Sequence, residues 1–403
     1  MRRLRTLSTS RLIGLAVGLV VLATGVGIAQ GALQSNPKPP AKPLDAAVHD
    51  ALSAPAVPGV TARVTFVNHL IPSGSLPEGT ASPLVTGASG RVWVAADGRF
   101  RIELQSSAGD AQVVSDGTTV TAYDATSNTA YRFTLPKRKT SDSTDHHAPP
   151  TLAQIDQAIA DVSKHWTLSG ATPTSTAGEP TYTVKISPKG DGGLLGAAAL
   201  AWDANNGIPL RAAVYASGQS SPVLELRATD VSFGAIADGD LNVPPPAGAK
   251  IVDLSPSDGS GSGSGANDTG GTHPKPVTGV ADVQAKLPFT LAAPDQLAGL
   301  PRRQVWLAGH DASDPAAVVT YGQGLGGIVV VEHKAKAGES SPLSGGGGRH
   351  GLQLPAIDVN GATGHELATA LGTVLTFQRG GVDYVVAGSI PAQSAETAAR
   401  QLG

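Results

Sequence analysis

The sequence predicts an α+β protein made of one long, curved antiparallel sheet, a smaller α+β domain after it, and an apolar N-terminal helix. Strand-length runs alternate apolar and polar residues and are separated by Asp-Gly turns, as in GRVWVAADGRFRIEL from Gly90 to Leu104. After Pro150 the spacing changes to that of an amphipathic helix. A Gly/Ser-rich stretch then divides the chain, which indicates two folded parts.

The N-terminus carries an export signal. Four arginines in MRRLRTLSTSR precede an uncharged run from Leu12 to Ala29. As a helix this run is about 27 Å long, close to the thickness of a bilayer core. It fits either a signal peptide or an uncleaved signal anchor, and its length favours the anchor. In both cases the chain after Gln34 is extracytoplasmic, either anchored at the cell membrane or secreted after cleavage.

Composition excludes several classes of function. The 29 basic and 32 acidic residues nearly balance, so no basic surface for nucleic acid is expected. The chain has no cysteine, which excludes disulfides, thiolate catalysis, Cys-based zinc sites and a lipid-modified N-terminal cysteine.

Segments rich in Pro, Gly and Ser set the expected domain boundaries. Residues 1–35 are the signal peptide or signal anchor, and 36–43 form a Pro-rich spacer. Residues 44–254 form the first domain, 255–276 a flexible linker, and 277–403 a small α+β domain.

The first domain begins with a short helical pattern, LDAAVHDAL, and then turns to strands. Tight turns are expected at Asp97-Gly98 and Asp116-Gly117. Near its middle, Thr151 and Gln154 have the spacing of a capping box. The helix that follows should place one apolar stripe on the sheet: Leu152, Ile155, Ile159, Val162 and Trp166.

A sheet of this many strands has to curl, and a helix across its concave side gives a half-open barrel with an apolar interior. The same residues could instead form an ordinary packed core. For the cavity we expect these side chains to line the interior: Val64, Phe66, Trp93, Phe100, Ile102, Leu104, Tyr131, Phe133, Ile155, Ile159, Trp166, Val184, Ile186 and Trp202.

The succession of strands and turns in the first domain resembles the LolA-like superfamily, which includes lipoprotein carriers, the RseB/MucB regulators and their actinobacterial relatives. The resemblance covers Leu44 to Leu254 and rests on GRVWVAADGRFRIEL, VVSDGTTVTAYDATSNTAYRF, WDANNGIPLRAAVYA and DVSFGAIADGDLNVPPPAGAKIVDL. It implies an incomplete antiparallel β-barrel lidded by helices, with a cavity for acyl chains.

The second domain is expected to contain the strands PFTLAA, RQVWLAG, AAVVTYG and GIVVVEHKA, two further hairpins, and a terminal helix, PAQSAETAARQL. Its pairing VLTFQRGGVDYVVAGS resembles a small domain of unknown function that accompanies LolA-like or anti-sigma-like modules.

No catalytic residue, metal site or cofactor is predicted. GQGLGG, Gly322 to Gly327, matches a dinucleotide motif, but strands flank it on both sides and it is expected to be a hairpin loop. His146 and His147 follow two aspartates in a polar loop, where no third ligand is in place. The histidines of the second domain lie on different elements, with no base, orienting group and nucleophile together.

These observations predict an exported, non-enzymatic binding protein that holds a lipid or lipidated molecule, as a carrier or chaperone of hydrophobic cargo. The alternative is a regulatory sensor similar to RseB/MucB that binds a membrane protein such as an anti-sigma factor. A pull-down without lipid separates the two.

Overall fold

The computed structural model describes residues 36–70, 83–135, 150–253, 277–308, 315–335 and 354–402. The predicted signal segment, the loop with His146 and His147, and the Gly/Ser linker lie outside these residues. In the described part of the chain, no helix is both long enough and apolar enough to cross a membrane. We call residues 36–253 the first region and residues 277–402 the second region.

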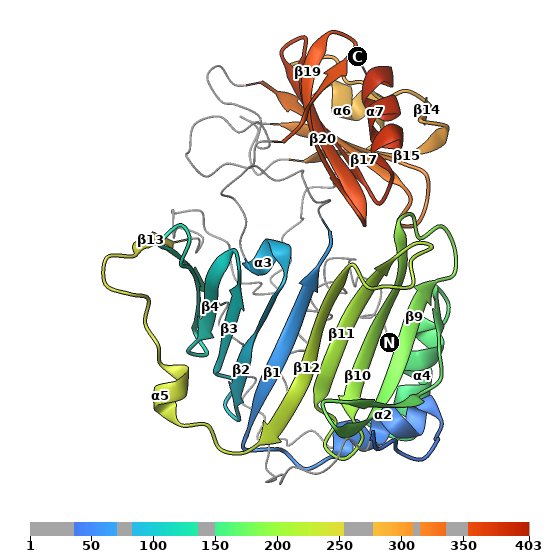
Figure 1. Ribbon diagram of the computed structural model, residues 1–403. Helices are drawn as coiled ribbons and strands as arrows, with labels where there is room; N and C mark the ends of the chain where they lie inside the picture. The colour runs from blue at the N-terminus through green and yellow to red at the C-terminus, as the bar shows by residue number, and fades with distance from the viewer. Residues whose placement is uncertain are drawn as a thin grey trace, which may run out of the picture.

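The first region is mostly β-structure, and its described residues form one curved sheet of 13 strands (Figure 1). The strand order is β13-β6-β5-β4-β3-β2-β1-β12-β11-β10-β9-β7, and β8 also pairs with β9. Neighbours are antiparallel except β13, which runs parallel to β6. The first six strands are β1 (Gly59–Asn68), β2 (Ala88–Ala95), β3 (Phe100–Ser106), β4 (Gly109–Ser115), β5 (Thr119–Asp124) and β6 (Thr129–Thr134). The others are β7 (Trp166–Leu168), β8 (Thr172–Thr176), β9 (Glu179–Pro188), β10 (Leu195–Asp203), β11 (Pro209–Ala216), β12 (Leu224–Phe233) and β13 (Lys250–Asp253).

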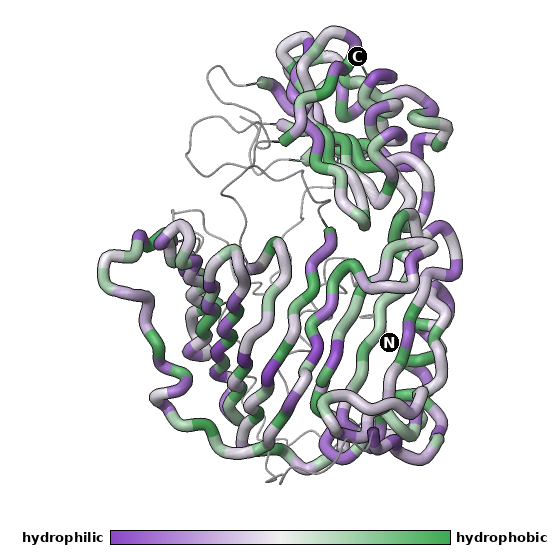
Figure 2. Tube along the Cα trace, in the orientation of Figure 1, coloured by the Kyte–Doolittle hydropathy of each residue, from purple (hydrophilic) through white to green (hydrophobic). Residues whose placement is uncertain are grey.

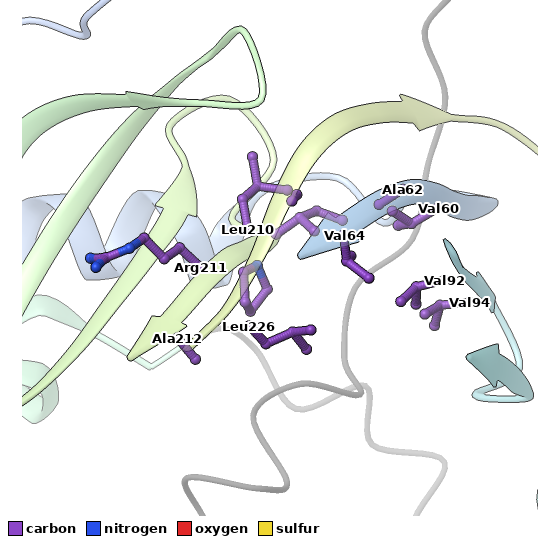
Figure 3. Close-up of a pocket in the computed structure, with 12 residues that line it drawn as sticks. Val60, Ala62, Val64, Val92, Val94, Leu210, Arg211, Ala212 and Leu226 are labelled. Carbon is purple, nitrogen blue, oxygen red and sulfur yellow. The ribbon is translucent and has the colours of Figure 1, made fainter. Parts of the chain in front are cut away.

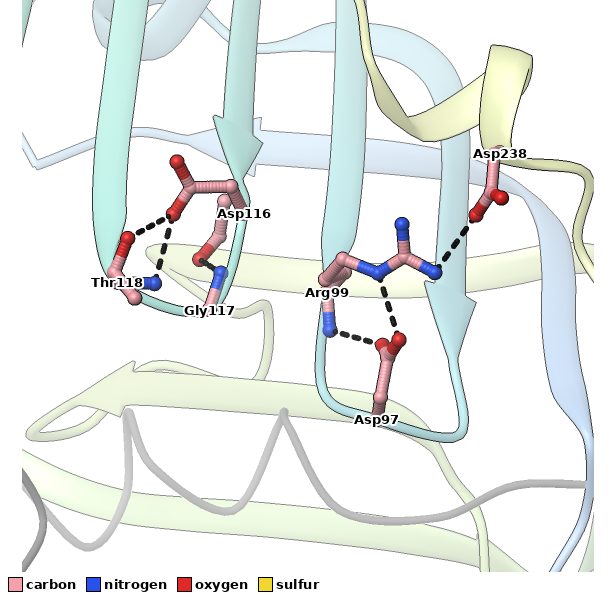
Figure 4. A network of polar contacts seen from close by, with 7 residues as sticks. Asp97, Arg99, Asp116, Gly117, Thr118 and Asp238 are labelled. Atoms are coloured by element: carbon pink, nitrogen blue, oxygen red, sulfur yellow. Dashed lines mark hydrogen bonds and ion pairs between the residues drawn. The ribbon is translucent and has the colours of Figure 1, made fainter.

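The two predicted Asp-Gly turns are confirmed (Figure 4). At Asp97 the carboxylate accepts hydrogen bonds from the main-chain N–H of Arg99 (3.0 Å) and from its Nε (2.7 Å). The Asp116 carboxylate accepts from the N–H and the hydroxyl of Thr118, both at 2.7 Å. Each turn also needs its glycine, because φ is +87° at Gly98 and +88° at Gly117.

Two helices lie at one end of this sheet. Helix α2 (Leu44–Ser53) packs its apolar side on β9 and β10. Helix α4 (Leu152–Val162) begins with the predicted capping box of Thr151 and Gln154 and packs against α2. The prediction that α4 lays a long apolar stripe on the sheet is wrong. Its end residues Leu152 and Val162 are 45% and 36% exposed, because α2 takes the place on the sheet.

The Pro-rich segment before α2, predicted as a spacer, packs against the sheet. Pro39 is buried, and the carbonyl of Pro40 accepts a hydrogen bond of 2.7 Å from the Tyr182 hydroxyl. The ammonium group of Lys42 lies 5.5 Å from the centre of the same ring. This segment therefore fixes the start of α2 to the outer strands.

After β12 the chain crosses the face of the sheet that carries Trp93 and reaches the edge at β6. Short helix α5 (Asp238–Leu241) buries Leu241 beside Trp93. The Asp238 carboxylate pairs with Arg99 at 2.8 Å, and the Gln112 side chain donates to the carbonyl of Val243 at 3.1 Å. The crossing ends where β13 joins β6. Helix α3 (Pro83–Thr86) precedes β2.

The second region is a sheet of eight strands in its described residues, in the order β14-β15-β16-β17-β21-β20-β19-β18. Its strands are β14 (Gln296–Leu297), β15 (Leu300–Ala308), β16 (Ala316–Tyr321), β17 (Ile328–Lys334), β18 (Ala356–Val359), β19 (Ala362–Thr369), β20 (Gly372–Arg379) and β21 (Val382–Gly388). All pairings between neighbours are antiparallel.

Helices α6 (Val280–Gln284) and α7 (Ala392–Gln401) cover this sheet. Ala395, Ala398 and Ala399 of α7 are fully buried, since their small side chains let the helix lie close to β20 and β21. The predicted strand PFTLAA is wrong: residues 288–293 are irregular, and the N–H of Ala292 donates to the Glu332 side chain instead of to a strand (2.9 Å). The terminal helix was predicted, and α6 was not.

Candidate functional site

The concave face of the first sheet is apolar over many strands. The strand register joins Phe66 to Leu226, Val60 to Val94, and Val92 to Ile102 across neighbouring strands. Because paired residues point to the same side of a sheet, these side chains share one face. Figure 2 shows the matching alternation of hydrophobic and hydrophilic residues along β1, β2 and β12.

The centre of this face is a loosely covered cluster. Its buried members include Val60, Val64 and Leu104, whereas Phe66 and Ile102 are only partly buried. Such half-burial differs from a packed core, whose members lose almost all contact with water. The face is therefore partly open to a ligand.

A small hollow of about 80 Å³ opens within the cluster (Figure 3). It is large enough for a few water molecules. It is lined mainly by aliphatic side chains from β1, β2, β11 and β12, namely Val60, Ala62, Val64, Val92, Val94, Ile208, Pro209, Leu210, Arg211, Ala212, Leu226 and Ala228. An occupant longer than a few methylenes would have to extend along the open face.

Several predicted cavity residues lie on this concave face. Val64, Phe66, Ile102 and Leu104 meet in the central cluster, and Phe100 shares their side through its pairing with Val94. Further along the same face, Tyr131 and Phe133 are 39% and 40% exposed. The β6 end is therefore the most exposed part of the face.

At the opposite end, α2 covers the face. Trp202 and Val184 pack with Tyr182 against the helix, and the rings of Tyr182 and Trp202 lie 6.2 Å apart. Ile186 is half-buried on the same side, opposite Ala198. The face is thus closed at β9 and β10 and open toward β6.

Three of the predicted residues, Trp93, Ile155 and Ile159, do not lie on this face of the sheet. Trp93 points to the far side of the sheet, because it alternates with Val92 and Val94. There its ring stacks near the guanidinium groups of Arg101 (4.8 Å) and Arg91 (5.5 Å). Ile155 and Ile159 belong to α4, which packs on α2. Trp166 lies in β7 rather than in the helix, but its pairing with Pro188 puts it on the same side of the sheet as Ile186.

Val60, Val92, Val94, Leu210 and Leu226 also lie on this face and were not predicted. The signal was present, since Val92 and Val94 flank Trp93 at the spacing that places them beside Ile102.

Two buried carboxylates, Asp203 and Glu332, accept hydrogen bonds from main-chain N–H groups. The Asp203 side chain accepts hydrogen bonds from the N–H groups of Asn205 (2.7 Å) and Asn206 (3.2 Å) and holds the turn after β10, while burial raises its pKa. Burial also raises the pKa of Glu332 in the second region, from 4.5 to about 7. Among the described residues, no group of three or more His, Asp or Glu side chains could hold a metal ion.

A second hollow, a cleft of about 500 Å³, lies between the two regions. One wall comes from the ends of first-region strands, with His69, Leu194, Ser217 and Val223. The other comes from Thr369, Ala370 and Pro391.

No protein-family model and no curated protein matches the sequence. Among solved structures, the chain is similar to the MucA/MucB complex of Pseudomonas aeruginosa, with 14% identity, a TM-score of 0.41, and coverage of 88% of this chain and 96% of that chain. MucB in complex with MucA(peri) matches at 15% identity and a TM-score of 0.38, over 88% of this chain and 94% of that chain. A LolA superfamily protein from Nitrosomonas europaea matches at 11% identity and a TM-score of 0.21, over 50% of this chain and 99% of that chain. These matches carry no activity over to this chain.

Proposed function

We propose that the protein is an exported, non-enzymatic binding protein that holds an acyl chain, as a lipid or a lipidated molecule, on the concave face of the first sheet. The segment Leu12 to Ala29 would keep it at the membrane. The observation that carries the proposal is the aliphatic face around Phe66 and Ile102, which stays only partly buried although α2 and α3 lie against parts of the sheet.

The shape of the face supports partial burial of the ligand rather than enclosure. Full transfer of a sixteen-carbon chain from water contributes about 12 kcal/mol, at about 0.8 kcal/mol per methylene. A chain lying on an open face loses about half of its water contact, which leaves on the order of 6 kcal/mol before ordering costs. Without ordering costs that free energy would correspond to a Kd of roughly tens of micromolar, and the ordering costs make the binding weaker than this. Such an affinity suits reversible binding.

A second candidate is a regulatory sensor that binds a segment of a membrane protein. The cleft between the regions supports it, because polar and apolar side chains from both regions line it. A pull-down of membrane proteins with lipid-free protein separates the candidates: the carrier proposal expects capture to need a lipid group on the partner.

The test of the acyl-chain proposal places a charge on the face. Ile102→Asp in the chain from Asn36 onward, purified without detergent, should lower the affinity for a fluorescent fatty acid at least about tenfold, because a carboxylate beside an acyl chain has no partner. Its melting temperature should fall only moderately, since water reaches this position.

The matched control is Val114→Asp. Val114 is also half-buried and lies on the adjacent strand, but it pairs with Arg101 on the far side of the sheet. This control should keep fatty-acid binding. A parent protein that binds no fatty acid, or equal losses in both variants, would refute the proposal.

A further inference from the structure

The loop Gly322–Gly327, between β16 and β17, touches the first region. The N–H of Leu325 donates to the carbonyl of Asp191 at 3.1 Å. Asp191 lies in the turn Lys189–Leu194, which joins β9 to β10. We call these two segments the glycine loop and the β9–β10 turn.

A second contact joins the same turn to the end of β21. The N–H of Leu194 donates to both the carbonyl and the hydroxyl oxygen of Ser389, each at 3.0 Å. The Ser389 hydroxyl in turn donates to the carbonyl of Leu371 at 2.7 Å, which fixes its position. A third bond runs from the N–H of Ala370 to the carbonyl of Leu70, at 2.8 Å.

Glycines make this close approach possible. A Cβ atom added to Gly193 would lie 2.0 Å from the carbonyl oxygen of Ser389, and one added to Gly324 would lie 2.5 Å from the carbonyl oxygen of Asp191. Both contacts are with main-chain atoms, which cannot rotate away as a side chain can. Any larger residue would therefore have to push the two regions apart.

We propose that the glycine loop and Ser389 form a docking surface whose partner is the β9–β10 turn of the same chain. Main-chain hydrogen bonds and glycines fix the second region on the first, so their relative position does not depend on the linker. The contact at Leu194 borders the cleft between the regions, and docking therefore sets the width of that cleft.

The test measures a distance between the regions in the full chain. Spin labels are attached at Ala160→Cys and Ala356→Cys, two exposed alanines of α4 and β18, in a chain with no other cysteine. Electron-electron double resonance should give one narrow distance distribution for the parent. Gly193→Ala and Gly324→Ala, which act from opposite sides of the contact, should each broaden and shift it.

Two control variants match the backbone strain without the contact. Gly218 (φ +74°) and Gly380 (φ +59°) also have left-handed conformations, but an added Cβ would meet no atom within 4 Å. Gly218→Ala and Gly380→Ala should keep the narrow distribution. A broad distribution in the parent overturns the proposal, and so does an equal effect of the control and contact variants. If one contact variant fails to fold, as judged by circular dichroism, the variant on the other side decides the question.

Discussion

The described part of the second region buries the apolar face of its sheet, whereas the described part of the first region leaves much of its apolar face only partly buried. In the second region, Val319, Val330 and Leu375 are fully buried beneath α6, α7 and the irregular segment at 288–293. In the first region, Val92, Val94 and Ile102 have the same aliphatic character and alternation, but they are only partly buried. Alternating apolar residues thus indicate which face of a sheet is dry, and the covering elements decide whether that face becomes a core or a surface for binding.

The largest expected loss of stability comes from a charge placed in the core of the second region. Val330→Asp puts an unpaired carboxylate into a fully buried position and should cost more than about 4 kcal/mol, which unfolds the second region. Ile102→Asp, on the open face, should cost on the order of 1–2 kcal/mol. Calorimetric melting of both variants makes the comparison.

The neighbouring residue serves as the control for Val330. Val329 is 37% exposed on the other side of the same strand, so Val329→Asp should change the melting temperature little. If Ile102→Asp destabilised its region as strongly as Val330→Asp does, the first sheet would have a packed core as well.

The next prediction concerns a polar group inside the covered sheet. Glu332 is 0% exposed, and one of its oxygens has no hydrogen-bond partner among the described residues. Burial raises its pKa from 4.5 to about 7, so the folded state holds a proton that the unfolded state releases. The second region should therefore be most stable below about pH 4.5, lose on the order of 3 kcal/mol as the pH rises to about 7, and stay level above it.

Glu332→Gln removes this titration and should make stability nearly independent of pH in that window. Urea unfolding of parent and variant at pH 5 and pH 8 provides the measurement. Glu396→Gln, which removes a surface carboxylate paired with Arg400, is the control and should keep the fall. A parent protein equally stable at both pH values would contradict the assignment.

The local elements were predictable from the sequence where short-range chemistry determines them. Asp97-Gly98 and Asp116-Gly117 turn because glycine has the required φ and aspartate accepts the turn's N–H groups. The capping box at Thr151 and Gln154 has the same local origin. Such features depend on neighbours within three residues, which a single sequence displays.

The covering of the sheet was not predictable in the same way. The helical spacing after Thr151 correctly placed α4, but which helix occupies the face depends on the earlier α2 and on its fit to Tyr182 and Trp202. Alternation correctly placed Ile102 on the apolar face, whereas Trp93 lies on the opposite face from Val92 and Val94. The contact that the glycine loop makes also depends on the β9–β10 turn, which lies more than a hundred residues away in the sequence.

The smallest expected effect concerns what holds one helix of each region in place, α4 in the first and α7 in the second. Helix α7 has no side-chain hydrogen bond at its N-cap and is held by three buried alanines, whereas α4 is largely exposed and begins with a complete capping box. Thr151→Ala should therefore cost about 1 kcal/mol of local stability and speed amide hydrogen exchange in α4 about fivefold. Thr151→Ser keeps the capping oxygen and should restore slow exchange. Unchanged exchange in Thr151→Ala would mean that packing on α2, through Ile155, holds α4 as firmly as the sheet holds α7.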